Sequence, residues 1–141
     1  MRFVLVVLLG LVLAPATMAE RSSAQTLQAG SSSFGKVLFD GRGFVVYAFT
    51  RDHGRSACYG ACARAWPPYF APKGALSVGA GVKRALLGTV KRTNGRRQVT
   101  YAGRPLYYYV RDKRAGQILC QDVFEYGGRW LIIRPSGRLV R

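Results

Sequence analysis

Two segments of this chain that start 60 residues apart align with each other, and this internal repeat constrains the fold more than any other feature. Residues 40–52 align without a gap with residues 100–112. Five aligned pairs share a residue type or an aromatic ring: Gly43 with Gly103, Tyr47 with Tyr107, Phe49 with Tyr109, Arg51 with Arg111, and Asp52 with Asp112. Units of about 50–60 residues bury too little surface to be stable alone. We therefore expect the two units to pack together as one domain with pseudo-twofold symmetry.

Short apolar segments separated by Gly-rich breaks predict strands from residue 36 onward. Two hairpins are expected, with strands at 36–39 and 44–50, and at 98–101 and 106–110. Further strands are expected at 83–92, 130–134 and 139–140, and a short helical turn between 56 and 66. The chain is thus predicted to be mainly β, a small antiparallel domain of two pseudo-symmetric hairpin-based repeats with little helix.

The N-terminal residues have the pattern of a cleaved secretory signal. One basic residue precedes an apolar run over residues 3–14, and small residues follow as far as Ala19. The run is shorter than the ~20 residues that cross a bilayer, although an uncleaved anchor is the alternative. We expect a signal peptide over 1–19 (cleavage after Ala16 or Ala24 being the alternatives), a flexible leader over 20–33, and a domain over 34–141 with repeat units at about 34–70 and 95–141. No second apolar stretch is long enough to span a membrane, so we expect an exported protein of the periplasm or the extracellular space.

The chain is strongly basic, with 22 Lys and Arg against 6 Asp and Glu and a formal net charge of +16. Loss of Arg2 with the signal peptide leaves +15. Basic residues are densest at 83–84, 91–92, 96–97 and 113–114. A field of this size attracts polyanions without a specific site. Outside the cytoplasm these would be anionic envelope polymers, lipid headgroups or acidic polysaccharides, whereas nucleic acid is not specifically indicated. The alternative is that the charge only keeps the protein soluble.

Three cysteines, Cys58, Cys62 and Cys120, give an odd number of thiols in a protein expected to be exported. An oxidising compartment favours a disulfide. Chain entropy favours pairing Cys62 with Cys120, since closing the long loop removes roughly 4 kcal/mol of unfolded-state freedom against ~2 kcal/mol for the short loop. The short spacing favours Cys58 with Cys62, because a helical turn places their Cα atoms ~6 Å apart. We assign Cys58 and Cys62 to the predicted disulfide, and the long-loop pairing stays open as the alternative.

The aromatic residues and the aspartates of the repeat are the candidate binding residues. On each strand two aromatic side chains share a face, because side chains alternate with a period of two. An aspartate just past each strand can cap a turn. The candidate set is Tyr47, Phe49, Asp52, Tyr107, Tyr109 and Asp112. Two interpretations stand side by side: a binding surface of aromatic platforms flanked by arginine, or ordinary core packing, which is the commoner use of such pairs.

Enzyme chemistry has little support in this sequence. The chain has a single histidine, His53, which lies beside Asp52 without the other partners of a nucleophilic triad. We expect no catalytic residues and no cofactor. A metal site is the alternative, because His53, Cys58 and Cys62 offer one imidazole and two thiolates suited to copper or zinc. That site would make the protein a periplasmic or secreted metal-binding or redox protein.

The order of the motifs resembles a known family. Residues 47–52 and 107–112 both fit the pattern Yx(FWY)xxD. The segments around them are, in order, Cys58 to Ala63, Trp66-Pro67-Pro68, Gln98 to Tyr101, Gly103 to Tyr107, Glu125 to Trp130 and Pro135-Ser136-Gly137. This series resembles the bacterial secreted-repeat family, which is described as predicted lipoproteins with a conserved Yx(FWY)xxD motif and unknown function. The resemblance implies export and a repeat-built domain, and it supplies no catalytic residues. The chain lacks the lipobox cysteine of many relatives, so a lipid anchor is not expected. We therefore expect a non-enzymatic exported protein that binds anionic polymers, or alternatively serves as an envelope spacer.

Overall fold

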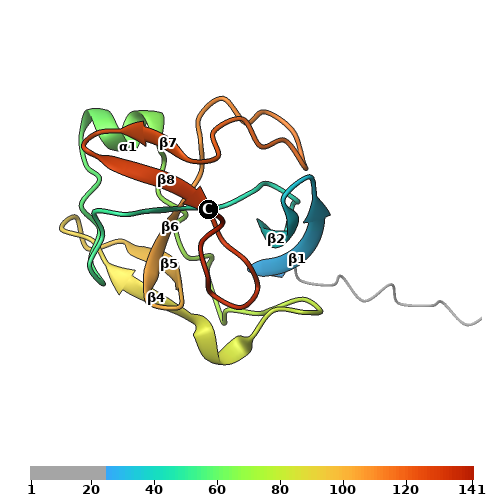
Figure 1. Cartoon of the computed structure of the whole chain (residues 1–141). Coiled ribbons are helices and arrows are strands. Elements are labelled where there is room, and N and C mark those ends of the chain that lie inside the picture. The colour runs from blue at the N-terminus through green and yellow to red at the C-terminus, as the bar shows by residue number, and fades with distance from the viewer. Residues whose placement is uncertain (1–24) are drawn as a thin grey trace, which may run out of the picture.

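Two antiparallel sheets make up the computed structural model, which describes residues 25–141 (Figure 1). The larger sheet has six strands in the order β4-β5-β6-β3-β8-β7, and β1 and β2 form the smaller one. The strands are β1 (Leu27–Ser32), β2 (Gly35–Asp40), β3 (Tyr47–Phe49), β4 (Leu87–Lys91), β5 (Arg97–Tyr101), β6 (Arg104–Tyr107), β7 (Val123–Glu125) and β8 (Gly128–Ile132), and the helices are α1 (Ala61–Ala65) and the 3₁₀ turn η1 (Arg84–Leu86). The predicted mainly β fold with little helix is confirmed. The signal peptide expected over 1–19 lies outside the described residues.

The two repeat units pair with each other in the middle of the large sheet. Strand β3 of the first unit lies between β6 and β8 of the second, and Tyr47 is the direct antiparallel partner of Tyr107. The expected second hairpin is present as β5 and β6, joined at Ala102 and Gly103, which both have positive φ as a two-residue hairpin turn requires. The local pseudo-twofold relation between the units therefore passes near the pair formed by Tyr47 and Tyr107.

The first expected hairpin, over residues 36–50, is shorter than predicted. Its turn is closed by an isolated bridge between Phe39 and Val45, and β3 begins only at Tyr47. The two segments of this hairpin diverge after the bridge, because β3 pairs with strands of the second unit instead of with β2. Strand β2 pairs instead with β1 along its whole length.

Strand β1 corrects the prediction of a flexible leader over residues 20–33 for its part from Leu27 to Ser32, whereas residues 20–24 lie outside the described residues. Leu27 is fully buried, and β1 runs antiparallel to β2 from Leu27 opposite Asp40 to Ser32 opposite Gly35. The segment has no apolar alternation because its side chains from Ala29 to Ser32 are small. The close fit requires this at Gly30, where an added Cβ would lie 2.8 Å from the ring of Phe39.

The core lies on both faces of the central strands. Tyr47 and Phe49 point into one buried cluster with Tyr107 and Trp130, whereas the intervening Ala48 points into the other. Both faces of β3 are thus covered, and all three of its residues are buried. Burial of both faces explains why the sequence of β3 is a nearly continuous apolar run rather than an alternation of apolar and polar residues.

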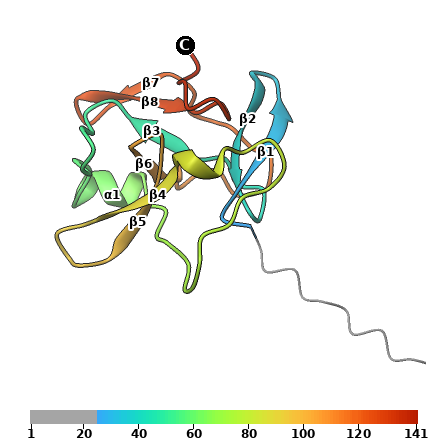
Figure 2. The same cartoon turned by 90° about the horizontal axis from the view of Figure 1, so that it is seen from below.

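Helix α1 carries the disulfide and lies at the end of the domain opposite β1 and β2 (Figures 1 and 2). The predicted disulfide between Cys58 and Cys62 is confirmed, with 5.3 Å between their Cα atoms. Cys120 is a buried free thiol, so the alternative pairing of Cys62 with Cys120 is not formed. No helix within residues 25–141 is long and apolar enough to cross a membrane.

Candidate functional site

The two repeated motifs exchange hydrogen bonds across the centre of the molecule. The hydroxyl of Tyr47 donates to Asp112 Oδ2 at 2.7 Å, and the hydroxyl of Tyr107 donates to Asp52 Oδ2 at 2.9 Å. Each tyrosine thus bonds the aspartate of the other unit rather than its own. We call these two contacts the crossed pairs. Because each contact joins both units, neither unit completes its own motif.

The second oxygen of each aspartate holds the loop that follows its own strand. The backbone N–H of Ala57 donates to Asp52 Oδ1 at 2.7 Å, and the N–H of Leu119 donates to Asp112 Oδ1 at 3.1 Å. Both aspartates are therefore turn-capping residues, as the sequence suggested, and also partners of the opposite tyrosine. Cap and crossed pair together satisfy the carboxylates inside the protein, as burial of a charged group requires.

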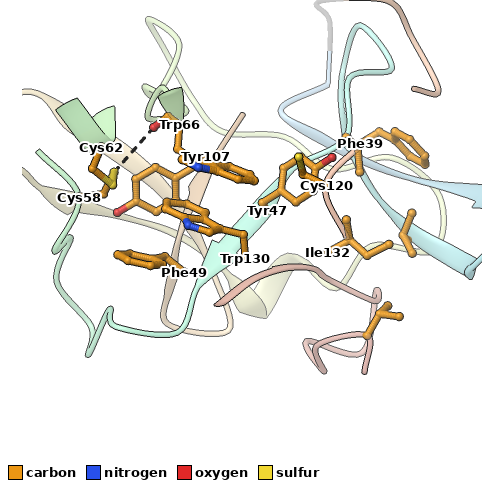
Figure 3. Close-up of a cluster of buried hydrophobic side chains, with 13 residues drawn as sticks. Phe39, Tyr47, Phe49, Cys58, Cys62, Trp66, Tyr107, Cys120, Trp130 and Ile132 are labelled. Atoms are coloured by element: carbon orange, nitrogen blue, oxygen red, sulfur yellow. Dashed lines mark hydrogen bonds between the residues drawn. A yellow bond between two sulfur atoms is a disulfide. The ribbon is translucent and has the colours of Figure 1, made fainter. Parts of the chain in front are cut away.

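A row of four aromatic rings runs through the centre of the domain, and Figure 3 shows three of them, Phe49, Trp66 and Trp130. The rings of Trp66 and Trp130 are parallel with centroids 4.0 Å apart. Phe49 stacks on the outer side of Trp130 at 4.1 Å, and Tyr109 lies 4.7 Å from Trp66. We call this set the aromatic stack. Its members alternate between units, so it also ties the two halves of the domain together.

The predicted binding residues are mostly inside the protein. Tyr47 and Tyr107 are fully buried and Phe49 exposes 2 % of its surface, while Asp52 and Asp112 expose 8 % each. Of the candidate set, only Tyr109 is half-buried. In this conformation five of the six side chains build the core and its crossed pairs, which leaves little of their surface for a ligand.

Burial shifts the proton affinities of the crossed pairs. Desolvation raises the pKa of Asp52 to about 6, although the hydrogen bonds from Ala57 and Tyr107 and the positive charge of Arg92 oppose it. Desolvation also raises the pKa of Asp112, against the hydrogen bond from Tyr47. The pKa values of the two tyrosines are raised far above their ordinary value, mainly by burial. The phenols therefore remain donors throughout the ordinary pH range.

The alternative metal site lacks thiolate ligands in this structure. Cys58 and Cys62 are joined in a disulfide, and His53, which precedes them in sequence, is exposed. Among residues 25–141, no group of three or more His, Cys, Asp or Glu side chains is arranged to hold a metal ion.

A surface hollow lies between the loop after the first motif and the end of strand β4. It has a volume of about 450 Å³. We call it the cationic pocket, and its lining residues are Arg55, Ser56, Tyr59, Val90, Lys91, Arg92 and Thr93. Three of these are basic, and in the described part of the chain no acidic side chain lines the pocket.

Arg92 forms the inner part of the cationic pocket and exposes only 5 % of its surface. Its guanidinium donates to Ser56 Oγ, to Gln98 Oε1 at 2.8 Å and to the carbonyl of Cys58 at 2.7 Å. The guanidinium also lies 4.2 Å from the ring centroid of Tyr59. The buried Nε of Arg92 has no hydrogen-bond partner. Arg92 thus positions the disulfide loop while bringing a positive charge to the pocket.

A hydrogen-bond chain connects the pocket to a crossed pair. Arg92 donates to Ser56, whose hydroxyl is bonded to the hydroxyl of Tyr107, which in turn donates to Asp52. The positive charge of Arg92 therefore lies near the carboxylate of Asp52, although the two groups form no direct ion pair.

The sequence predictions did not identify this pocket. The signal was present in the basic sequence at Lys91 and Arg92, but one basic pair among several gave no reason to single it out. The pocket differs from the other basic segments because Arg92 is buried. This burial results from the packing of β4 against the disulfide loop, so the sequence alone does not reveal it.

The geometry defines a class of protein: a pseudo-symmetric β domain made of two units that complete each other's motifs. The chain belongs to the family described as a secreted repeat of unknown function, which matches residues 29–69 and 88–133. These two matched segments contain β3 and β6, the strands that carry the two tyrosines of the crossed pairs. The resemblance seen in the sequence is thereby confirmed. No curated protein and no solved structure matches the chain significantly.

Proposed function

We propose that this secreted-repeat protein is a non-enzymatic domain that binds anionic polymers of the cell envelope or of the space around the cell. The observation that carries the proposal is that most acidic side chains are buried whereas most basic side chains are exposed. Within residues 25–141, Asp40, Asp52 and Asp112 are buried and Glu125 is half-buried, which leaves Asp122 as the exposed acid. The acids serve mainly to hold the fold together, and their charge is largely withdrawn from the surface.

The basic side chains show the opposite distribution. In the described part of the chain, every Lys and Arg is exposed except the buried Arg92 and the half-buried Arg104 and Arg134. Two ion pairs form among these residues, between Arg42 and Asp40 and between Arg129 and Asp122. The surface therefore presents many cations that no neighbouring carboxylate neutralises. Such a field raises the local concentration of polyanions and the rate at which they associate.

An exported basic domain meets a restricted set of polyanions. Outside the cytoplasm these are acidic polysaccharides, phosphate-containing wall polymers and lipid headgroups. Polymers are the favoured partner, because a long anionic chain can engage cations on several faces at once. Each exposed contact is weak, and many together give useful affinity.

The test is retention of the purified mature protein on columns of heparin and of polygalacturonate, with a neutral dextran column as the control. Elution of the protein from both anionic columns well above physiological ionic strength is expected, because many weak contacts must be screened together. Elution at or below about 150 mM salt would contradict the proposal. Anionic and zwitterionic vesicles provide a parallel sedimentation assay, in which binding stronger than that to the polymers would point to lipid headgroups instead.

A further inference from the structure

We propose that the cationic pocket binds a single acidic sugar unit, whose carboxylate or phosphate group pairs with Arg55 and Lys91 while its ring packs against Tyr59. The inference rests on the proposed binding of anionic polymers and assigns their specific contact to one site. Three features distinguish the pocket from the rest of the basic surface: its uncompensated charge, its aromatic wall and its size.

Within the described residues, no carboxylate forms a direct ion pair with the basic side chains of the pocket. Arg92 is buried but hydrogen-bonds only neutral groups, namely a hydroxyl, an amide oxygen and a backbone carbonyl. A buried charge is normally paired, because removal of the charge from water is costly. The carboxylate of Asp52 lies near enough to interact with this charge, but Ser56 and Tyr107 separate the two groups. An anion entering beside Arg92 would supply the direct ion pair that this guanidinium does not form inside the protein.

The strand end beside the pocket adds to this unbalanced charge. Lys91 lies directly opposite Arg97 on the neighbouring strand β5. Like charges in directly opposite positions destabilise an antiparallel pair. Both side chains are exposed and neither forms an ion pair within residues 25–141. A bound anion would relieve this repulsion, so the arrangement favours occupancy of the pocket by a negatively charged group.

Tyr59 gives the pocket an aromatic wall, which suits a sugar ring rather than a bare anion. Its side chain is 38 % exposed although it lies against the guanidinium of Arg92. The contact with Arg92 limits the rotation of the ring, which lowers the entropy lost on binding. Thr93 adds a hydroxyl group that can hydrogen-bond the hydroxyls of a sugar. The volume of about 450 Å³ lies within the ~300–1,000 Å³ range of small-molecule sites.

Two other hollows provide a comparison. One, of about 360 Å³, contains Asp40, which already neutralises Arg42. The other, of about 430 Å³, is lined by Arg134, Arg138 and Arg141 but has no aromatic wall. The first is unsuited to an anion, and the second offers charge without a surface for a sugar ring. The second hollow is therefore a matched control for charge alone.

The first experiment titrates the ¹⁵N-labelled protein with galacturonate, glucose 6-phosphate and neutral galactose, and follows backbone NMR signals. Shifts concentrated at residues 55–59 and 91–93 with the two acidic sugars, and much smaller ones with galactose, are expected. A response to galacturonate alone would identify the carboxylate as the preferred group, and a response to glucose 6-phosphate alone would identify the phosphate. No response to either sugar, or equal shifts over the whole basic surface, would overturn the inference.

The second experiment compares two double variants with the same loss of charge. Arg55→Gln with Lys91→Gln changes the cationic pocket, and Arg138→Gln with Arg141→Gln changes the control hollow. We expect the first pair to weaken binding of oligogalacturonate or a short polyphosphate by roughly tenfold, and the control pair by less than about threefold. Tyr59→Ala should weaken the sugar polymer more than the polyphosphate, because only the sugar contacts the ring.

These variants also separate the two proposals. Equal weakening by both double variants would leave the proposed polymer binding intact and show that it uses distributed charge, which removes the assigned site. Failure of the unmodified protein to bind any of the polymers would instead contradict the proposed function itself. All four substituted basic residues are exposed, and circular dichroism should confirm that each variant keeps the fold.

Discussion

The loop after the first motif, residues 53–60, and the loop after the second, residues 113–120, begin at equivalent aspartates but differ in what they hold. The first loop contains the disulfide cysteine Cys58 and leads through Ser56 to Arg92 and the cationic pocket. The second ends in an exposed Leu119 and the free thiol of Cys120. The strands and the crossed pairs are shared by the two units, whereas the loops are not. The comparison shows that the repeat supplies a symmetric core, whereas the disulfide and the cationic pocket involve the loop of one unit only.

The largest expected difference between the two loops concerns pH. Burial raises the pKa of Asp52 to about 6, above its unfolded value of 3.8. A raised carboxyl pKa gives stability that is fully present below pH ~4 and is lost as the pH rises through about 6. Asp52→Asn should therefore flatten the pH dependence of the free energy of unfolding, removing a loss of about 3 kcal/mol that the wild type undergoes between pH ~4 and pH ~8. Urea unfolding at a series of pH values between 4 and 8 measures it.

Asp122→Asn is the matched control, since it makes the same chemical change at an exposed aspartate and should leave the pH dependence in place. Asp112→Asn should change the pH dependence in the same direction as Asp52→Asn, because burial also raises the pKa of Asp112. If Asp52→Asn left the pH dependence of the free energy of unfolding unchanged, the ionisation of Asp52 would not be the cause of that dependence. The groups that face Asp52 are Tyr107, the N–H of Ala57, Arg92 and His53.

The crossed pairs can be broken one at a time. Tyr107→Phe removes the partner of Asp52 Oδ2 and one of the two partners of the Ser56 hydroxyl, whereas Tyr47→Phe affects only Asp112. Loss of a hydrogen bond to a buried charged group costs about 2–3 kcal/mol. We expect both variants to be destabilised by about this amount in guanidinium unfolding at pH 7.5, and Tyr107→Phe more than Tyr47→Phe.

The double variant tests whether the two contacts act together. If the crossed pairs form one cooperative connection between the units, Tyr47→Phe and Tyr107→Phe together should lose less than the sum of the single losses. Strictly additive losses would show that the contacts are independent. Tyr126→Phe serves as a control, because its side chain is exposed and no side-chain hydrogen bond is formed by its hydroxyl in the described structure.

The smallest expected effect is the difference in stability lost when the disulfide cysteines or the free Cys120 are replaced. Replacing Cys58 and Cys62 with serine removes a cross-link over a short loop, which is worth ~2 kcal/mol in the unfolded state. Cys120→Ala removes a small buried group and should cost about 1 kcal/mol. Thermal unfolding with and without a reductant measures both. A reductant should lower the Tm of the wild type and of the Cys120 variant, and leave that of the disulfide variant unchanged.

The fold was largely predictable because its determinants are local and repeated. The period-two geometry of a strand identified which aromatic side chains of residues 47–50 and 106–109 share a face, and the spacing of Cys58 and Cys62 identified the disulfide. Strand β1 was missed because its small side chains give no pattern of apolar residues. Those small side chains allow the ring of Phe39 to lie against Gly30.

The crossing of the motifs and the pocket could not be predicted in the same way. An aspartate that follows its own strand can equally cap its own loop or reach the other unit, and in this structure Asp52 and Asp112 do both. Arg92 was hidden for a different reason. In a chain with 22 basic residues, the sequence gives no means of telling which one is buried.

The crossed pairs also bear on the origin of the chain. A single unit would carry a tyrosine without its aspartate and an aspartate without its tyrosine, so an ancestor of one unit could complete both contacts only by associating with a second copy. Such a homodimer depends on protein concentration for its stability. Duplication and fusion of the gene would have made that association intramolecular and independent of dilution. Only then could the two loops diverge separately, because a change in one was no longer copied into the other.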